Sequence, residues 1–179
     1  TQHGPREEIG WIHDWGMAAT SQNRDWVHLL LAQMPGNTEL TLVHCTAPNL
    51  PQKVGDLEAR IQSAQASVVV IQIGDNLNAG DATDETLRKP VARLLQAADA
   101  RSAKVVVGVW GGDDVRDQLL EQAAEDAGAL FVPIHDLANQ PGHRAWEQGV
   151  FDEPAVGWHP SDLGMAAIAD RVADALGYE

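Results

Sequence analysis

The sequence predicts a parallel α/β fold: a doubly wound sheet with helices on both faces, in a flavodoxin-like three-layer α/β/α arrangement. Three apolar runs, at 68–73, 104–110 and 129–134, are typical of central strands that are covered on both faces. Segments with apolar residues at helical spacing separate these runs. Such an alternation of strands and helices is typical of a parallel sheet.

The N-terminal part predicts a loop followed by a helix. Residues 1–19 are rich in Gly, His and Trp and show neither strand alternation nor helical periodicity, so we expect an ordered loop that helps to form a site. Thr20 or Ser21 is expected to cap a helix that ends at Pro35-Gly36-Asn37. The apolar face of this helix consists of Val27, Leu30, Leu31 and Met34.

The middle of the chain continues the alternation. Residues 40–44 read as a strand, and the run 68–73 leads through a loop at 74–84 into a helix. Pro90 marks the first turn of that helix or a kink in it. The helices here are predicted from apolar positions at Val54, Leu57 and Ile61, at Val91, Leu94 and Leu95, and at Val115, Leu119 and Ala123.

His159 precedes an amphipathic C-terminal helix. Ser161 or Asp162 is expected to cap this helix, and Gly177 is placed to end it. Its apolar face consists of Met165, Ile168, Ala169, Val172 and Leu176. The imidazole therefore lies on a loop anchored by a rigid element, as a general base requires, although a lone loop histidine is more often a surface residue.

Composition limits the classes of partner. With 12 Lys and Arg against 26 Asp and Glu, the net charge of −14 argues against a nucleic-acid or anionic-membrane partner. No apolar run approaches the roughly 20 residues that a membrane span needs.

A length of 179 residues with 44% hydrophobic content predicts a single domain, 1–179. The single cysteine, Cys45, excludes an internal disulfide and reads as a small buried residue, and the compartment stays open, with a secreted or periplasmic location allowed.

Gly74-Asp75-Asn76 is the most informative strand exit. In parallel α/β folds, sites form beyond the carboxyl ends of the strands. Gly74 allows a sharp turn, and Asn76 then carries an amide donor that suits an oxyanion hole. The plainer interpretation is an Asx-type turn.

The start of the chain differs from this fold plan. A doubly wound sheet normally opens with a central strand, yet this sequence opens at Thr1, without Met, on the loop that should follow one. We therefore expect a first strand that this sequence lacks.

Together these motifs resemble the SGNH (GDSL-type) hydrolase superfamily. Gly74-Asp75-Asn76 matches its third block, Gly-x-Asn, and His159-Pro160-Ser161-Asp162-Leu163-Gly164-Met165 matches its last block, which carries the catalytic His. The N-terminal run is similar to a bacterial subgroup, in which Gly-Asn-Ser-Ile-Thr runs into His-Gly-Pro, Gly-Trp and Trp-Gly-Met-Ala-Ala. The corresponding segments here are Thr1, His3-Gly4-Pro5, Gly10-Trp11 and Trp15-Gly16-Met17-Ala18-Ala19.

The resemblance implies ester hydrolysis through a serine acyl-enzyme. His159 would be the general base and Asn76 an oxyanion-hole donor beside Gly74. The family's second-block Gly has no clear match, but Thr46 or Ala47 occupies its region, and a backbone N–H there could still donate. The nucleophilic Ser would lie two residues before Thr1.

The family often places an Asp three residues before the His, and Val156 stands at that position. Asp152 or Glu153 is the nearest acid in sequence. The resemblance also permits a Ser-His pair in which a backbone carbonyl holds the imidazole.

The expected substrate is a small-molecule ester, with an acetylated carbohydrate preferred. Tryptophans at loops and strand exits suit stacking on sugar rings, although many such residues only pack at the edge of a hydrophobic core. The expected substrate-binding residues are Trp15, Trp110, Trp158 and His3. Neither a cofactor nor a metal site is expected, because no pair of histidines has ligand spacing.

Two other readings compete with the hydrolase. One is a catalytically inactive relative, a carbohydrate-binding module or a fragment. The other is a nucleotide binder of the same architecture, which ranks lower because no phosphate-binding glycine motif follows a strand.

Overall fold

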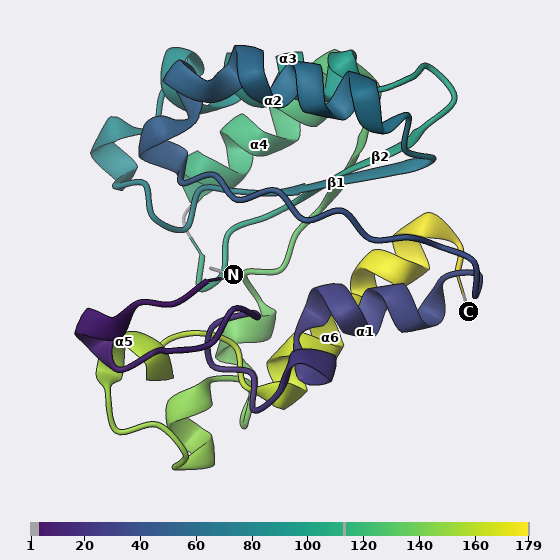
Figure 1. Cartoon of the computed structure of the whole chain (residues 1–179). Helices are drawn as coiled ribbons and strands as arrows, with labels where there is room; N and C mark the ends of the chain where they lie inside the picture. The colour runs from purple at the N-terminus through teal and green to yellow at the C-terminus, as the bar shows by residue number, and fades with distance from the viewer. Residues whose placement is uncertain (1–3, 113, 179) are drawn as a thin grey trace. The chain divides into compact units, whose positions relative to one another are not determined.

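The computed structural model describes residues 4–112 and 114–178, and the chain divides into two compact units. The sheet unit is Cys45–Pro133, and the helical unit combines Thr1–His44 with Ile134–Glu179. Figure 1 shows the elements of both. Because this division follows compactness alone, the single domain 1–179 stays a prediction.

The sheet unit confirms the predicted fold class, a parallel sheet with helices around it. Its strands are β1 (Val68–Gln72), β2 (Ala103–Val107) and β3 (Leu130–Val132). They lie in the order β1-β2-β3, all parallel, with Val70 opposite Val105 and Val106 opposite Phe131. The helices of this unit are α2 (Leu50–Ala64), α3 (Lys89–Ala97) and α4 (Asp114–Ala127).

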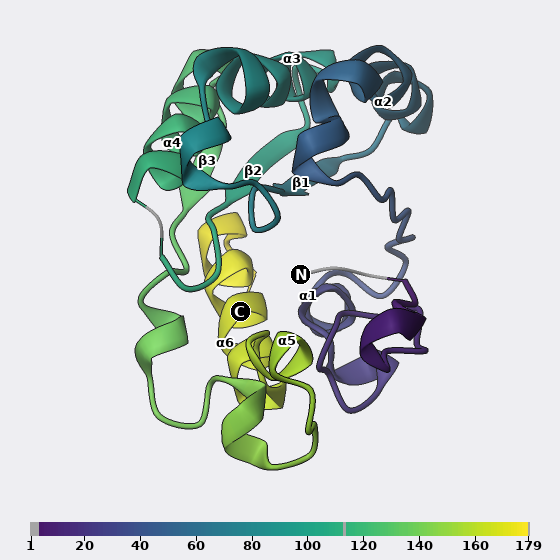
Figure 2. The same ribbon diagram turned by 90° about the vertical axis from the view of Figure 1, so that its left-hand side faces the viewer.

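The core of the sheet unit lies between the strands and these helices. Figures 1 and 2 show α2, α3 and α4 on the same side of the sheet. Their fully buried side chains meet Val106 of the central strand, and each such side chain contributes about 1.5–3 kcal/mol relative to exposure. The largest helical side chains of this core are Leu50, Val91, Leu95 and Leu120, and Leu87 joins them from the helical turn Asp84–Arg88.

The helical unit is built from α1 (Trp26–Gln33), α5 (Pro154–Gly157) and α6 (Asp162–Leu176). α1 packs against α6. The Gln33 amide donates to the Asp170 carboxylate at 2.8 Å, so a polar contact also joins the two helices. No described helix of either unit is long and apolar enough to cross a membrane.

Short helical turns connect these elements. The 3-10 turns are η1 (Glu7–Ile9), η2 (Gln22–Arg24), η3 (Ala47–Asn49), η4 (Ala79–Asp81), η6 (Leu137–Asn139) and η7 (Ala145–Gln148), and η5 (Asp84–Arg88) is a π-helical turn. Pro90 lies in the first turn of α3, one of the two positions expected for it.

The predicted strand at 40–44 is wrong. Residues 38–46 belong to no helix or strand and form no ladder with any described residue, and Leu40, Leu42 and Val43 are each more than a third exposed. Alternating apolar residues favour a strand, but a strand also needs a partner for its backbone groups. The only described strand that pairs with β1 is β2.

The start of the first helix is also corrected, whereas the ends of the last are confirmed. Asp25 caps α1 by accepting the His28 backbone N–H at 2.9 Å, and Thr20 and Ser21 precede a separate 3-10 turn. Ser161 caps α6, and Gly177 ends it in a left-handed conformation.

Candidate active site

The loop that carries His159 is held by backbone hydrogen bonds within the helical unit. Ala145 N–H donates to the His159 carbonyl at 3.0 Å, and Ser161 N–H donates to the His143 carbonyl at 2.8 Å. His159 N–H donates to the Val156 carbonyl at 3.1 Å. The backbone around the imidazole is thus fixed from both directions.

Ser161 joins this loop to the helix that follows it. Its buried hydroxyl donates to the Gly142 carbonyl at 2.6 Å and accepts the Gly164 N–H at 3.1 Å. The next residue, Asp162, accepts the Thr20 N–H and hydroxyl at 2.9 and 2.6 Å. The N-terminal loop and the His159 loop are therefore tied together inside one unit.

The His159 imidazole is neutral at pH 7. Desolvation lowers its pKa from 6.5 to about 3, although the residue as a whole is only half-buried. A neutral imidazole is the form that a general base requires.

The acid partner of His159 stays a prediction. No hydrogen bond joins the imidazole to another described residue. Asp152 is exposed and makes no described contact with His159, while Glu153 caps α5 by accepting the Ala155 N–H at 3.3 Å. Val156, at the position where the family often has Asp, is buried.

The lowered pKa predicts how acid affects stability. Below pH 6.5 the unfolded chain binds a proton at His159 that the folded chain binds only near pH 3, so the free energy of unfolding falls as the pH drops through this window. His159→Gln removes this term. Urea unfolding at pH 7 and pH 5 should show a smaller loss of stability in the variant than in the wild type. An equal loss in both proteins would show that His159 titrates normally.

The turn that carries Asn76 lies at the carboxyl end of β1. Gly74 has φ +122°, and a Cβ there would lie 3.2 Å from Val109 Cγ2, so the turn favours glycine. Arg116 Nη1 donates to the carbonyls of Gly74 and Leu77, both at 2.9 Å. Sequence reasoning missed Arg116, because an arginine 42 residues after Gly74 carries no local signal.

Asp75 fastens the same turn to the next strand exit. Its carboxylate accepts the Trp110 N–H at 2.8 Å. The Asn76 side chain is exposed and makes no hydrogen bond with a described residue. The Asn76 side chain therefore does not form an Asx-type turn with a described residue.

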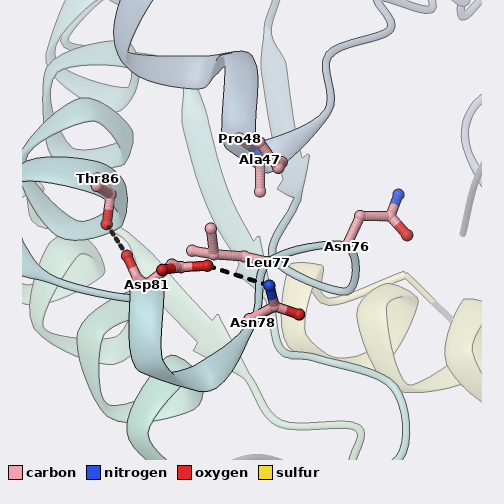
Figure 3. Close-up of a pocket in the computed structure, with 7 residues that line it drawn as sticks. All are labelled: Ala47, Pro48, Asn76, Leu77, Asn78, Asp81 and Thr86. Atoms are coloured by element: carbon pink, nitrogen blue, oxygen red, sulfur yellow. Dashed lines mark hydrogen bonds between the residues drawn. The ribbon is translucent and has the colours of Figure 1, made fainter.

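A small hollow of about 200 Å³ lies beside Asn76 in the sheet unit. Figure 3 shows the Asn76 side chain pointing away from Asn78 and Asp81, which are hydrogen-bonded to each other at 3.1 Å. The residues that line the hollow are Ala47, Pro48, Asn76, Leu77, Asn78, Asp81 and Thr86. Ala47, in the region where the resemblance places the second block, thus lines the same hollow as Asn76.

Thr46 lies next to the hollow but does not line it. Its hydroxyl accepts the Asn49 amide N–H at 2.9 Å, and its carbonyl accepts the Asn49 backbone N–H at 3.0 Å. Its backbone N–H is not engaged by a described residue.

The remaining predicted site residues differ in exposure. Trp15 stacks on His13, with ring centroids 4.1 Å apart, and donates from Nε1 to the Ala19 carbonyl. Trp110 is only 4% exposed, whereas Trp158 is 44% exposed. His3 lies outside the described residues. Their roles in substrate binding stay predictions.

His159 and Asn76 belong to different units, so the structure defines the surroundings of each residue separately. Within the described ranges, no three metal-ligating side chains gather at one place.

Comparison with known proteins identifies the fold. No family model and no curated protein sequence matches the chain. A solved lipolytic protein of the G-D-S-L family from Desulfitobacterium hafniense DCB-2 is similar, with a TM-score of 0.55 and 13% identity over 87% of this chain and 90% of that one. A member of the same family from Veillonella parvula DSM 2008 has a TM-score of 0.57 and 12% identity over 89% of this chain and 91% of that one. The chain therefore has the fold of the lipolytic G-D-S-L (SGNH-type) proteins.

Proposed function

We propose that this chain belongs to a serine ester hydrolase, with His159 as general base and Asn76 as an oxyanion-hole donor. The observation that carries the proposal is the Asn76 side chain, which is exposed and makes no hydrogen bond with a described residue, in a turn at a strand end whose carbonyls accept hydrogen bonds from Arg116. The fold shared with the G-D-S-L proteins supports it, because hydrolases are built on that fold.

The reaction has two steps. His159 takes the proton of the serine hydroxyl as its oxygen attacks the ester carbonyl, and Asn76 with backbone N–H groups stabilises the oxyanion. The tetrahedral intermediate collapses to an acyl-enzyme and expels the alcohol, which receives the proton from His159. Water, deprotonated by His159, then attacks the acyl-enzyme and releases the acid and the serine.

The nucleophile is expected on a serine upstream of Thr1, as the resemblance of the N-terminal motif implies. The serines of this chain are Ser21, Ser63, Ser67, Ser102 and Ser161. None of them lies on a strand-to-helix turn suited to a nucleophile, and Ser161 is committed to capping α6.

The substrate class is an acetylated carbohydrate. Trp158 supports it, because a half-exposed indole beside the His159 loop offers a flat face to a sugar ring.

A substrate comparison tests this assignment. In the full-length natural protein, kcat/KM for an acetylated methyl glycoside should exceed that for ethyl acetate by roughly tenfold, the effect of about 1.4 kcal/mol of ring stacking. Trp158→Ala should remove most of this preference. Equal values for both esters in the wild type would exclude a carbohydrate substrate, while ligand binding without turnover would favour the inactive module.

A further inference from the structure

Arg144 stands between two tryptophans on the surface of the helical unit. Its Cζ lies 3.8 Å from the ring centroid of Trp158 and 5.0 Å from that of Trp146. The two indole rings are 5.5 Å apart and tilted by 57°. Trp146 was not predicted as a site residue, because it lies in the irregular segment that precedes the His159 loop.

Arg144 is a buried cation that forms no salt bridge in the described part of the chain. The residue is 8% exposed, and burial lowers the pKa of its guanidinium, an effect that the charge of Glu147 partly offsets. The Glu147 carboxylate itself accepts the Gly142 N–H at 2.6 Å. Among the described residues, the Arg144 side chain makes one long hydrogen bond, from Nη1 to the Trp158 carbonyl at 3.5 Å.

In this arrangement most of the guanidinium N–H groups make no hydrogen bond with a described residue. Arginine has five N–H donors, and a buried charge is costly unless it is paired. Contact with aromatic faces recovers about 0.5–2 kcal/mol, which offsets only part of that cost. A chain with net charge −14 has many carboxylates to offer, yet none pairs with Arg144 among the described residues.

Both tryptophans of the cluster are partly exposed. Trp146 is 45% exposed and Trp158 44%. Trp146 approaches the backbone closely at Gly157, where a Cβ would lie 3.0 Å from Trp146 Cβ. A glycine at this position therefore lets the Trp146 ring stand beside Trp158.

The cluster lies directly beside the proposed general base. Arg144 forms an antiparallel bridge with Pro160, and Ala145 N–H donates to the His159 carbonyl at 3.0 Å. Trp158 immediately precedes His159. A ligand held on these rings would thus be held next to the imidazole.

We propose that Arg144, Trp146 and Trp158 form a binding subsite for a sugar ring that carries a carboxylate. The indoles contact the ring face, and the guanidinium N–H groups that make no internal hydrogen bond donate to the carboxylate. The inference deepens the proposed function by naming an acidic sugar unit as part of the substrate. It rests on that function only for the link to catalysis, because binding needs no nucleophile.

Tryptophan fluorescence titration of the full-length natural protein tests the subsite directly. Methyl β-D-glucuronide should bind at least about tenfold more tightly than methyl β-D-glucoside, since a hydrogen bond to a charged group contributes about 1.5–3 kcal/mol. Arg144→Gln should abolish this preference, and Arg101→Gln, which changes an almost fully exposed arginine, should keep it. Trp146→Ala should weaken the binding of both sugars, and circular dichroism shows which variants remain folded.

Several results would overturn the subsite. Equal affinity of the wild type for the two glycosides would remove the role of the carboxylate. Tighter binding of glucose 6-phosphate than of the glucuronide would reassign Arg144 to a phosphate. An unchanged preference in a folded Arg144→Gln protein would show that Arg144 only packs on the indoles. Ester turnover without glucuronide binding would refute the subsite alone, whereas binding without turnover would refute the proposed hydrolase alone.

Discussion

Replacing His159 with Ala in the full-length natural protein should lower kcat for ester hydrolysis by about 10²–10⁴-fold, the usual contribution of a general base. The side chain makes no hydrogen bond with a described residue, so its loss should leave the fold intact. Steady-state kinetics and circular dichroism measure both quantities.

Asn76→Ala is the companion variant of this experiment. Loss of one oxyanion-hole donor should cost about 10²–10³-fold in kcat. Asn78→Ala is its matched control, because the Asn78 amide already donates to the Asp81 carboxylate at 3.1 Å. Unchanged turnover in both His159→Ala and Asn76→Ala would contradict the assignment.

Replacing Asp25 with Ala should destabilise the protein by about 2–4 kcal/mol, the combined effect of a lost helix cap and a buried N–H left without its acceptor. The Asp25 carboxylate is fully buried and accepts the Gly16 N–H at 3.0 Å, the His28 N–H at 2.9 Å and the His28 ring at 2.8 Å. The substitution removes the cap of α1 and leaves the buried Gly16 N–H without its acceptor.

Asp170→Ala is the control for Asp25→Ala. The Asp170 carboxylate also accepts a hydrogen bond, from Gln33, but at the exposed surface of the same unit. Its loss should change the free energy of unfolding by no more than about 0.5 kcal/mol. Urea denaturation compares the two variants, and similar effects of both substitutions would mean that the Asp25 network is not structural.

The strands of the sheet were the best-predicted part of the fold. Each of the three long apolar runs became a strand, but only β2 lies between two described strands, and β1 is half-buried along its whole length. The strand predicted at 40–44 was wrong because alternating apolar residues say nothing about whether a neighbouring strand is available to pair with the backbone. The cap of α1 was missed although its signal is local, because Asp25 accepts the backbone N–H of His28 within the first turn of the helix.

The candidate site was predictable only where a local motif carries the chemistry. His159 and Asn76 follow from short patterns at a helix start and a strand end. Arg116 supports the Asn76 turn from 42 residues away, and Arg144 meets Trp158 across 14 residues of irregular chain. Such partners are set by tertiary packing, which a single sequence does not encode locally.

Fluorophosphonate labelling of the full-length natural protein, followed by peptide mapping, tests the central claim most directly, because the probe reacts with an activated serine. We predict one adduct, on a serine upstream of Thr1, and loss of that adduct in the His159→Ala variant. The absence of an adduct, or an adduct on a serine within residues 1–179, would contradict it.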